Sequence, residues 1–282
     1  MPPDAFIRII RSCSLSLINA SFSVELDSRW VARQPKYIAS IVMPSLTELD
    51  LRLIDLSWDP LFPLVLQLPV LQKFSIGEAD RNFPLKWNLH VYGALALRSA
   101  RTLKTFRLVD LEINTETKLP VNVIPGTYHH RSTPPRLSSH FELEEFLRAF
   151  PLIENLALPL SLYIHYTTLE KVAMGTLLPV LETLEIGTGT YTDASAVLAM
   201  VRKRNPAQSS STSPWVPSPF SFLTLILPTM TAQMQAQVTQ AAHSLGLESG
   251  CHLWFIPRCK SWKDHQKQEV CGRHCFFPYT TS

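Results

Sequence analysis

LPVLETLEIGT, residues 178–188, nearly repeats LPVLQKFSIGE, residues 68–78, which lies 110 residues earlier in the chain. Both segments share Leu-Pro-Val-Leu, two polar residues, an apolar residue, a variable position and Ile-Gly. In the later copy Leu184 and Ile186 alternate with polar residues, as in a strand that buries one of its faces. This self-similarity predicts one structural unit that is used more than once.

The pattern apolar-x-x-apolar-x-apolar extends well beyond these two segments. Its matches are Leu46/Leu49/Leu51, Leu71/Phe74/Ile76, Leu103/Phe106/Leu108, Ile153/Leu156/Leu158, Leu181/Leu184/Ile186 and Phe222/Leu225/Leu227. Their starts lie 25 to 50 residues apart, a spacing typical of repeat proteins. A proline precedes four of the predicted strands, where a missing backbone donor costs least: Pro44, Pro69, Pro151 and Pro179.

Between the predicted strands the apolar period changes to that of a helix. Residues 138–150 place an apolar stripe on one helix face. Residues 191–204 end in three cations that suit a helix C-terminus, and residues 229–246 end in a glycine. Strands that alternate with helices predict an α/β fold with parallel strands and the helices outside. An ordinary doubly wound α/β domain alternates in the same way and is the competing interpretation.

Composition bounds the class of protein. The 282 residues are 46% hydrophobic and 17% charged, which indicates a globular chain, and 22 prolines predict short, interrupted elements. No apolar run approaches the roughly 20 residues that cross a bilayer. Of the 5 cysteines, four lie in the last 32 residues, which does not suit a disulfide framework. We therefore expect a cytoplasmic or nuclear protein without a membrane partner.

The motif and its surroundings resemble a known family. RSCSLSLINAS, MPSLTELDLRLID, LRAFPLIENLALP and LPVLETLEIG resemble leucine-rich repeats, above all the degenerate repeats in the C-terminal part of fungal F-box proteins. The resemblance covers roughly residues 10–256 and implies a leucine-rich-repeat solenoid with parallel strands on the concave face and helices outside. The ninth repeat position, usually Asn or Cys, holds neither residue in any unit, which favours an irregular arc: Ile54, Ala79, Leu111, Ser161, Gly189 and Met230.

The expected organisation is one repeat domain over residues 1–256, with insertions at about 114–138 and 205–219. A basic, poorly ordered tail follows over residues 257–282. The tail contains weak candidates for zinc ligands, since thiolates and imidazoles suit that metal: Cys259, His265, Cys271 and Cys275. Their spacing matches no paired Cys-x-x-Cys arrangement, so we predict no metal.

The resemblance implies a non-catalytic protein–protein interaction module, like the substrate-recognition region of F-box ubiquitin-ligase subunits. In such arrays the variable residues of the strand motifs line the concave face. The charged ones are the predicted partner-binding residues: Glu48, Asp50, Arg52, Lys73, Lys104, Arg107, Glu154, Glu182 and Glu185. Their mixed signs favour a protein partner or substrate over nucleic acid, which needs a mostly basic stripe.

Two alternatives to this function stay open. The F-box is a short helical module that opens on Leu-Pro, and none is found at the N-terminus. A ligase adaptor as partner therefore follows from the resemblance alone. An orphan scaffold without ligase contact fits as well. A nucleotide-binding α/β enzyme would use Gly187 and Gly189, although Thr192 replaces the third glycine of the dinucleotide fingerprint. The sequence contains no Gly-x-Ser-x-Gly, His-Glu-x-x-His or phosphate-loop lysine. We therefore predict neither catalysis nor a cofactor.

Overall fold

The structure is a computed structural model of the 282-residue chain. It describes residues 2–25, 40–54, 66–79, 89–110, 112–113, 120–121, 140–159, 162, 164–188, 190–205, 217–227, 231–245 and 250–255. The metal candidates of the C-terminal tail, most of both predicted insertions and Gly189 lie outside these residues.

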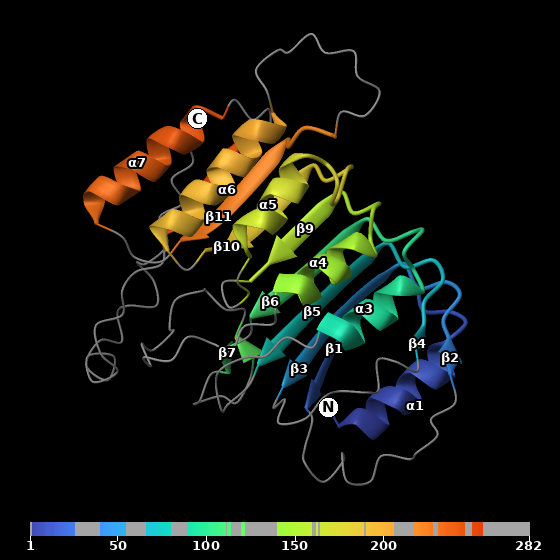
Figure 1. Ribbon diagram of the computed structural model, residues 1–282. Helices are drawn as coiled ribbons and strands as arrows, with labels where there is room; N and C mark the ends of the chain where they lie inside the picture. The colour runs from blue at the N-terminus through green and yellow to red at the C-terminus, as the bar shows by residue number, and fades with distance from the viewer. Residues whose placement is uncertain are drawn as a thin grey trace, which may run out of the picture.

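An eight-stranded parallel sheet forms the centre of the molecule (Figure 1). Its strands lie side by side in the order in which they occur along the chain: β1 (Asn19–Glu25), β3 (Glu48–Ile54), β5 (Lys73–Ala79), β6 (Thr105–Asp110), β9 (Asn155–Leu158), β10 (Thr183–Gly187), β11 (Phe222–Leu227) and β12 (Cys251–Phe255). Two short pairs accompany it, parallel β2 (Ile41–Val42) with β4 (Leu66–Gln67) and antiparallel β7 (Glu112–Ile113) with β8 (Pro120–Val121). The predicted parallel arrangement is confirmed.

The described helices all cover the same face of the sheet (Figure 1). They are α1 (Pro3–Cys13), α3 (Leu89–Leu97), α4 (His140–Arg148), α5 (Tyr166–Ala173), α6 (Tyr191–Arg204) and α7 (Ala232–His243). Right-handed crossovers that always advance in one direction place every helix on one side. A doubly wound sheet instead reverses its strand order and carries helices on both faces. The order of the described strands has no reversal, so the doubly wound interpretation is wrong.

The Leu-Pro-Val-Leu segments form β-turns that lead into the strands. In each turn the amide of the first motif residue donates to the carbonyl three residues earlier, at 3.2 Å for Leu181 to Leu178 and 3.3 Å for Leu71 to Leu68. Pro179 and Pro69 occupy the second turn position, where the fixed φ of proline matches the turn. Pro44 and Pro151 lie in equivalent turns. The repeated sequence motif thus encodes a repeated turn and strand.

A second backbone feature repeats across the sheet at the residue before each strand. The carbonyl of Thr47 accepts the amides of Gln72 at 2.8 Å and Lys73 at 3.0 Å. The same double acceptance occurs at the carbonyls of Ile18, Gln72, Lys104, Glu154 and Glu182, each receiving two amides from the next strand. Because the pattern recurs at every step from β1 to β11, successive units share one register.

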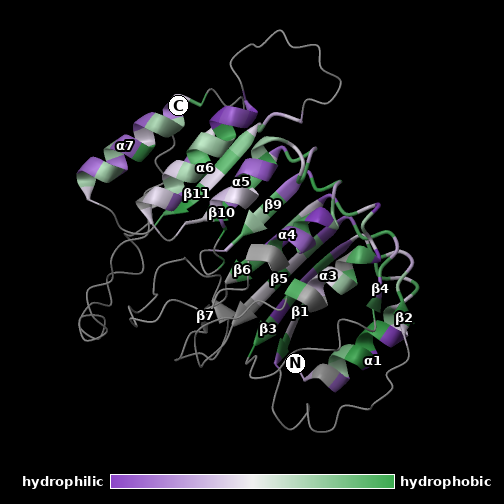
Figure 2. Ribbon diagram, in the orientation of Figure 1, coloured by the Kyte–Doolittle hydropathy of each residue, from purple (hydrophilic) through white to green (hydrophobic). Residues whose placement is uncertain are grey.

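The apolar motif residues point toward the helices and form one hydrophobic core. Leu49, Leu51, Leu184 and Ile186 are all at most 3% exposed, and burying a side chain of this size stabilises the fold by roughly 1.5–3 kcal/mol. Aromatic rings join the sheet to α4, with the Phe106 ring centroid 4.8 Å from that of Phe146. Figure 2 shows hydrophilic residues on α4 and α5 where these helices face away from the sheet.

The register of the sixth motif differs from the prediction by two residues. Leu223 pairs with Leu184 and Leu225 with Ile186, so the unit is Phe220/Leu223/Leu225 rather than Phe222/Leu225/Leu227. The segment FSFLTLIL contains both matches, but only the earlier one buries its phenylalanine, since Phe220 is 2% exposed. Phe222 therefore lies on the opposite face of the sheet, where its ring contacts His252 at 4.8 Å.

Candidate functional site

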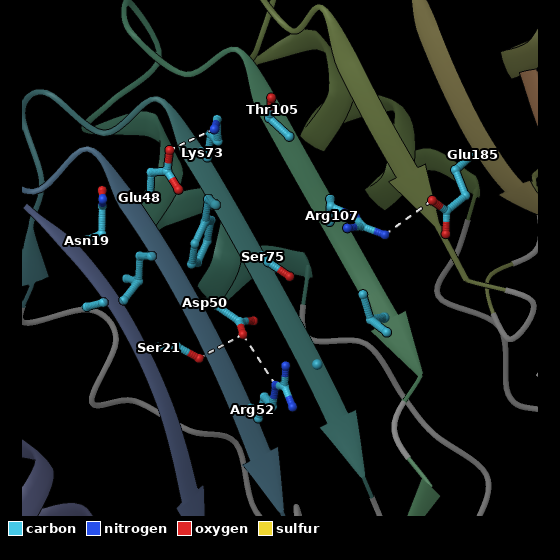
Figure 3. A pocket seen from close by; sticks show the side chains of 15 residues that line it. Asn19, Ser21, Glu48, Asp50, Arg52, Lys73, Ser75, Thr105, Arg107 and Glu185 are labelled. Atoms are coloured by element: carbon cyan, nitrogen blue, oxygen red, sulfur yellow. Dashed lines mark hydrogen bonds and ion pairs between the residues drawn. The ribbon is translucent and has the colours of Figure 1, made fainter. Parts of the chain in front are cut away.

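The face of the sheet opposite the described helices is called the open face; it carries every second strand residue, many of which are polar. A groove of about 730 Å³ lies on it above β1, β3, β5 and β6 and reaches Glu185 of β10 (Figure 3). Its floor contains small or uncharged side chains, among them Ser75, Gly77 and Thr105. Glu48, Asp50, Arg52, Lys73 and Arg107 also line it. The strand alternation thus gathers charges from distant parts of the chain on one surface.

All the predicted partner-binding residues lie on or beside this surface. Six of them line the groove: Glu48, Asp50, Arg52, Lys73, Arg107 and Glu185. Lys104, Glu154 and Glu182 do not; each precedes its strand by one residue, at the amino end of β6, β9 and β10. The six groove residues follow the alternation of their strands, whereas the other three were placed here as variable residues of the repeat motif. The role of all nine in binding stays a prediction.

Opposite charges pair on the half of the open face formed by β1, β3 and β5. The Lys73 ammonium lies 2.7 Å from Glu48 Oε1. Asp50 Oδ2 accepts hydrogen bonds from Ser21 Oγ at 2.9 Å and from Arg52 Nε at 3.3 Å (Figure 3). These side chains are partly exposed, so each pair contributes little to stability, typically 0–1 kcal/mol.

The half formed by β6, β9 and β10 pairs in the same manner. Lys104 Nζ donates to Glu154 Oε1 at 2.8 Å, and this hydrogen bond, reinforced by nearby Glu182, raises the pKa of Lys104 above its ordinary value. Arg107 Nη2 reaches Glu185 Oε2 at 3.2 Å. The two side chains come from β6 and β10, with β9 between them. Ala157 of β9 occupies the register position between Arg107 and Glu185, and its small side chain does not block their contact.

The sequence-based prediction missed part of the groove. Asn19 and Ser21 of β1 and Gly77 and Val109 further along the sheet complete its lining. The signal for β1 was present, because Ala20 pairs with Leu49 and Phe22 with Leu51 in a segment that alternates as a strand does. Alanine at the first of these positions weakened the apolar pattern.

Of the two glycines of the alternative nucleotide site, only Gly187 lies among the described residues. Gly187 is the last residue of β10 and is buried. The amino end of α6 is occupied by its own side chains, since Thr190 Oγ1 accepts the Asp193 amide at 3.2 Å and bonds the Asp193 carboxylate at 2.8 Å. A carboxylate at this position repels phosphate, although it suits the helix dipole.

The described residues contain no cluster of three or more His, Cys, Asp or Glu side chains able to hold a metal ion. Cys251 of β12 is the nearest cysteine to the predicted tail, and burial raises the pKa of its thiol to about 11.

Two buried charges were not predicted. Arg204, predicted from sequence to lie in the last turn of a helix, is 2% exposed and donates to backbone carbonyls. Glu144 of α4 is 6% exposed and joins α5, accepting Lys171 Nζ at 2.6 Å and Thr168 Oγ1 at 3.1 Å. The Lys171 hydrogen bond lowers the pKa of Glu144 below its ordinary value. No local pattern signals such residues, because most of their partners are more than 20 residues away.

Comparison with protein-family models, curated proteins and solved structures finds no match to this chain. Within the described ranges, every helix is too short or too polar to cross a bilayer. The residues and geometry of the open face are therefore the basis for a functional proposal.

Proposed function

We propose that the chain is an irregular leucine-rich-repeat-like solenoid and a non-catalytic protein-binding module whose open face holds the partner. The observation that carries this proposal is a polar, grooved sheet surface on which charges of both signs from several strands converge. Support for the solenoid comes from strands in chain order, helices on one face and the double acceptance at each pre-strand carbonyl.

The chemistry of the open face favours a polypeptide partner. In two of its ion pairs, Lys73–Glu48 and Arg107–Glu185, the side chains are 36–58% exposed. Each of these side chains can therefore exchange its partner for another at small cost. Hydroxyl and amide groups between them provide hydrogen-bond donors and acceptors. A nucleic acid would instead select a predominantly basic surface.

The resemblance to F-box proteins extends this proposal to substrate recognition for a ubiquitin ligase. The alternative within the same class is an orphan scaffold that binds a protein without the ligase. Affinity purification of the full chain separates the two, because a ligase subunit recovers the adaptor and the cullin. Recovery of other proteins without either component would leave the scaffold.

A matched pair of charge variants tests the open face itself. The open-face variant combines Lys104→Glu with Arg107→Glu, and the helix-face variant combines Arg8→Glu with Arg11→Glu on α1, where both arginines are exposed. Both change the net charge equally. We expect quantitative mass spectrometry to show proteins retained by the wild type and the helix-face variant but lost from the open-face variant. Equal recovery by all three would show that the open face is not the binding surface.

A further inference from the structure

The charges of the open face are sorted into bands that run along the strands. The first acidic band consists of Glu48 and Asp50 on β3. The basic band consists of Lys73 on β5 with Lys104 and Arg107 at β6, and the second acidic band of Glu154, Glu182 and Glu185 at β9 and β10. Among the described open-face residues, Arg52 breaks the order, and it is paired with Asp50 of its own strand at 3.3 Å.

Neighbouring bands neutralise each other across their boundaries. Lys73 reaches back to Glu48, while Lys104 and Arg107 reach forward to Glu154 and Glu185. These contacts hold the side chains on the open face, yet each is exposed enough for an incoming charge to replace it at little cost. The face is therefore ready to exchange internal pairs for external ones.

The floor of the groove, formed by β5 and β6 within the basic band, suits a backbone rather than a bulky side chain. Ser75 and Gly77 are successive outward residues of β5. Thr105 of β6 pairs with Lys73, one outward position before Ser75 (Figure 3). Hydroxyls on this floor can pair with the free amides and carbonyls of an extended segment. A helix satisfies those groups internally and would gain nothing from them.

We propose that the open face binds an extended polypeptide segment that lies across the strands and carries a cation, an anion and a second cation in that order. This inference rests on the proposed function and specifies its partner. Parallel strands lie about 4.8 Å apart, which separates the first acidic band from the basic band by about 7 Å and the basic band from the second acidic band by about 10 Å. At about 3.4 Å per extended residue, the anion lies about two residues from the cation over β3 and about three residues from the cation over β9 and β10, whichever way the segment runs.

The order of the bands also excludes simpler charge patterns. A polyanion meets two acidic bands, and a run of cations meets the basic band at its centre, so each suffers like-charge repulsion. Only a segment whose charges alternate in sign makes favourable charge contacts with all three bands.

A display experiment tests the inference with a defined probe. A phage library of random dodecapeptides is selected on the immobilised full chain, and enriched peptides are synthesised and titrated by fluorescence anisotropy. We expect an Asp or Glu with Lys or Arg about two residues to one side and about three residues to the other, in one consistent direction. The open-face variant should bind these peptides at least about tenfold more weakly and the helix-face variant as wild type does.

Selection on the open-face variant should enrich peptides of a different kind. With the basic band inverted it presents mainly acidic side chains, so selection on it should enrich uniformly cationic peptides, and a cooperative thermal unfolding transition checks that the variant is folded. Wild-type binders without the predicted order, but sensitive to the open-face variant, would overturn this inference and leave the proposed function intact. Failure to enrich peptides, or binders that ignore the open-face variant, would overturn both.

Discussion

Arg204→Met tests whether a buried guanidinium holds the connection between α5, β10 and β11 together. Arg204 donates from Nε to the Ser218 carbonyl at 2.7 Å and from Nη1 to that of Val172 at 2.8 Å. Nη2 lies 2.9–3.0 Å from the carbonyls of Leu178, Pro179 and Leu181. Burial lowers the pKa of Arg204 to about 10, which still leaves a cation at neutral pH. Methionine fills much of the volume but offers no donor.

The cost of this substitution follows from opposing terms. Hydrogen bonds from a charged donor contribute about 1.5–3 kcal/mol each, but three of the contacts share one nitrogen, and removing the cation recovers its desolvation cost of several kcal/mol. Leu178 also has a φ of 50°, a strained conformation for a leucine that its contact with Arg204 helps to hold. We expect a net loss of about 3–5 kcal/mol, because several buried carbonyls lose their donor at about 1–3 kcal/mol each and the recovered desolvation cost offsets part of this.

Thermal unfolding followed by circular dichroism measures the effect. At about 2–4 °C per kcal/mol for a chain of this size, the Tm of Arg204→Met should fall by about 10 °C. Arg204→Lys keeps the charge but not the planar fork and should lie between the two. Lys203→Met, at the exposed neighbouring position, should change stability by no more than about 0.5 kcal/mol. A Tm of Arg204→Met within about 2 °C of wild type, which corresponds to about one kcal/mol or less, would refute the reasoning.

Two further changes probe other features of the structure. Since the Lys171 hydrogen bond lowers the pKa of Glu144, the ionised form contributes stability that is complete above the usual glutamate pKa of about 4.3 and is lost as pH falls through the lower folded value. Glu144→Gln should therefore flatten the acid side of a urea-stability profile, and an unchanged slope would contradict this. Gly175 has a φ of 71°, and a Cβ at this position would lie 2.6 Å from Pro217 Cβ. Gly250 has a φ of 96°, but nothing lies within 4 Å of a Cβ there. Gly175→Ala should therefore lower the Tm more than Gly250→Ala, and an equal decrease would show that Pro217 moves aside.

The strand register was predictable where the motif was unique and unpredictable where two matches overlapped. Leu184 and Ile186 occupy the positions expected from alternation, because each lies in a single possible frame. The segment around Phe222 offered two frames, and the choice between Phe220 and Phe222 depended on which ring fits the core beside its neighbours. Packing against the other units selects the Phe220 frame, so the local sequence does not reveal it.

Helices were predicted unevenly for a related reason. The segments of α4, α6 and α7 carry an apolar period or terminal signals of their own. The segment of α3, LHVYGALAL, is apolar on nearly all sides and contains Gly93, so it lacks a helical period. There a Cβ would lie 3.3 Å from the Phe146 ring, which indicates that close packing against α4 favours glycine.

By itself, the amino-acid sequence determined which side chains share a face of the sheet, because alternation along a strand depends only on neighbouring residues. It therefore placed Asp50, Arg107 and Glu185 on one surface. Only the tertiary structure decided that Arg107 pairs with Glu185 across Ala157 and that Arg204 is buried among backbone carbonyls. These contacts join residues far apart in the chain, and the distances between them are set by how successive units pack.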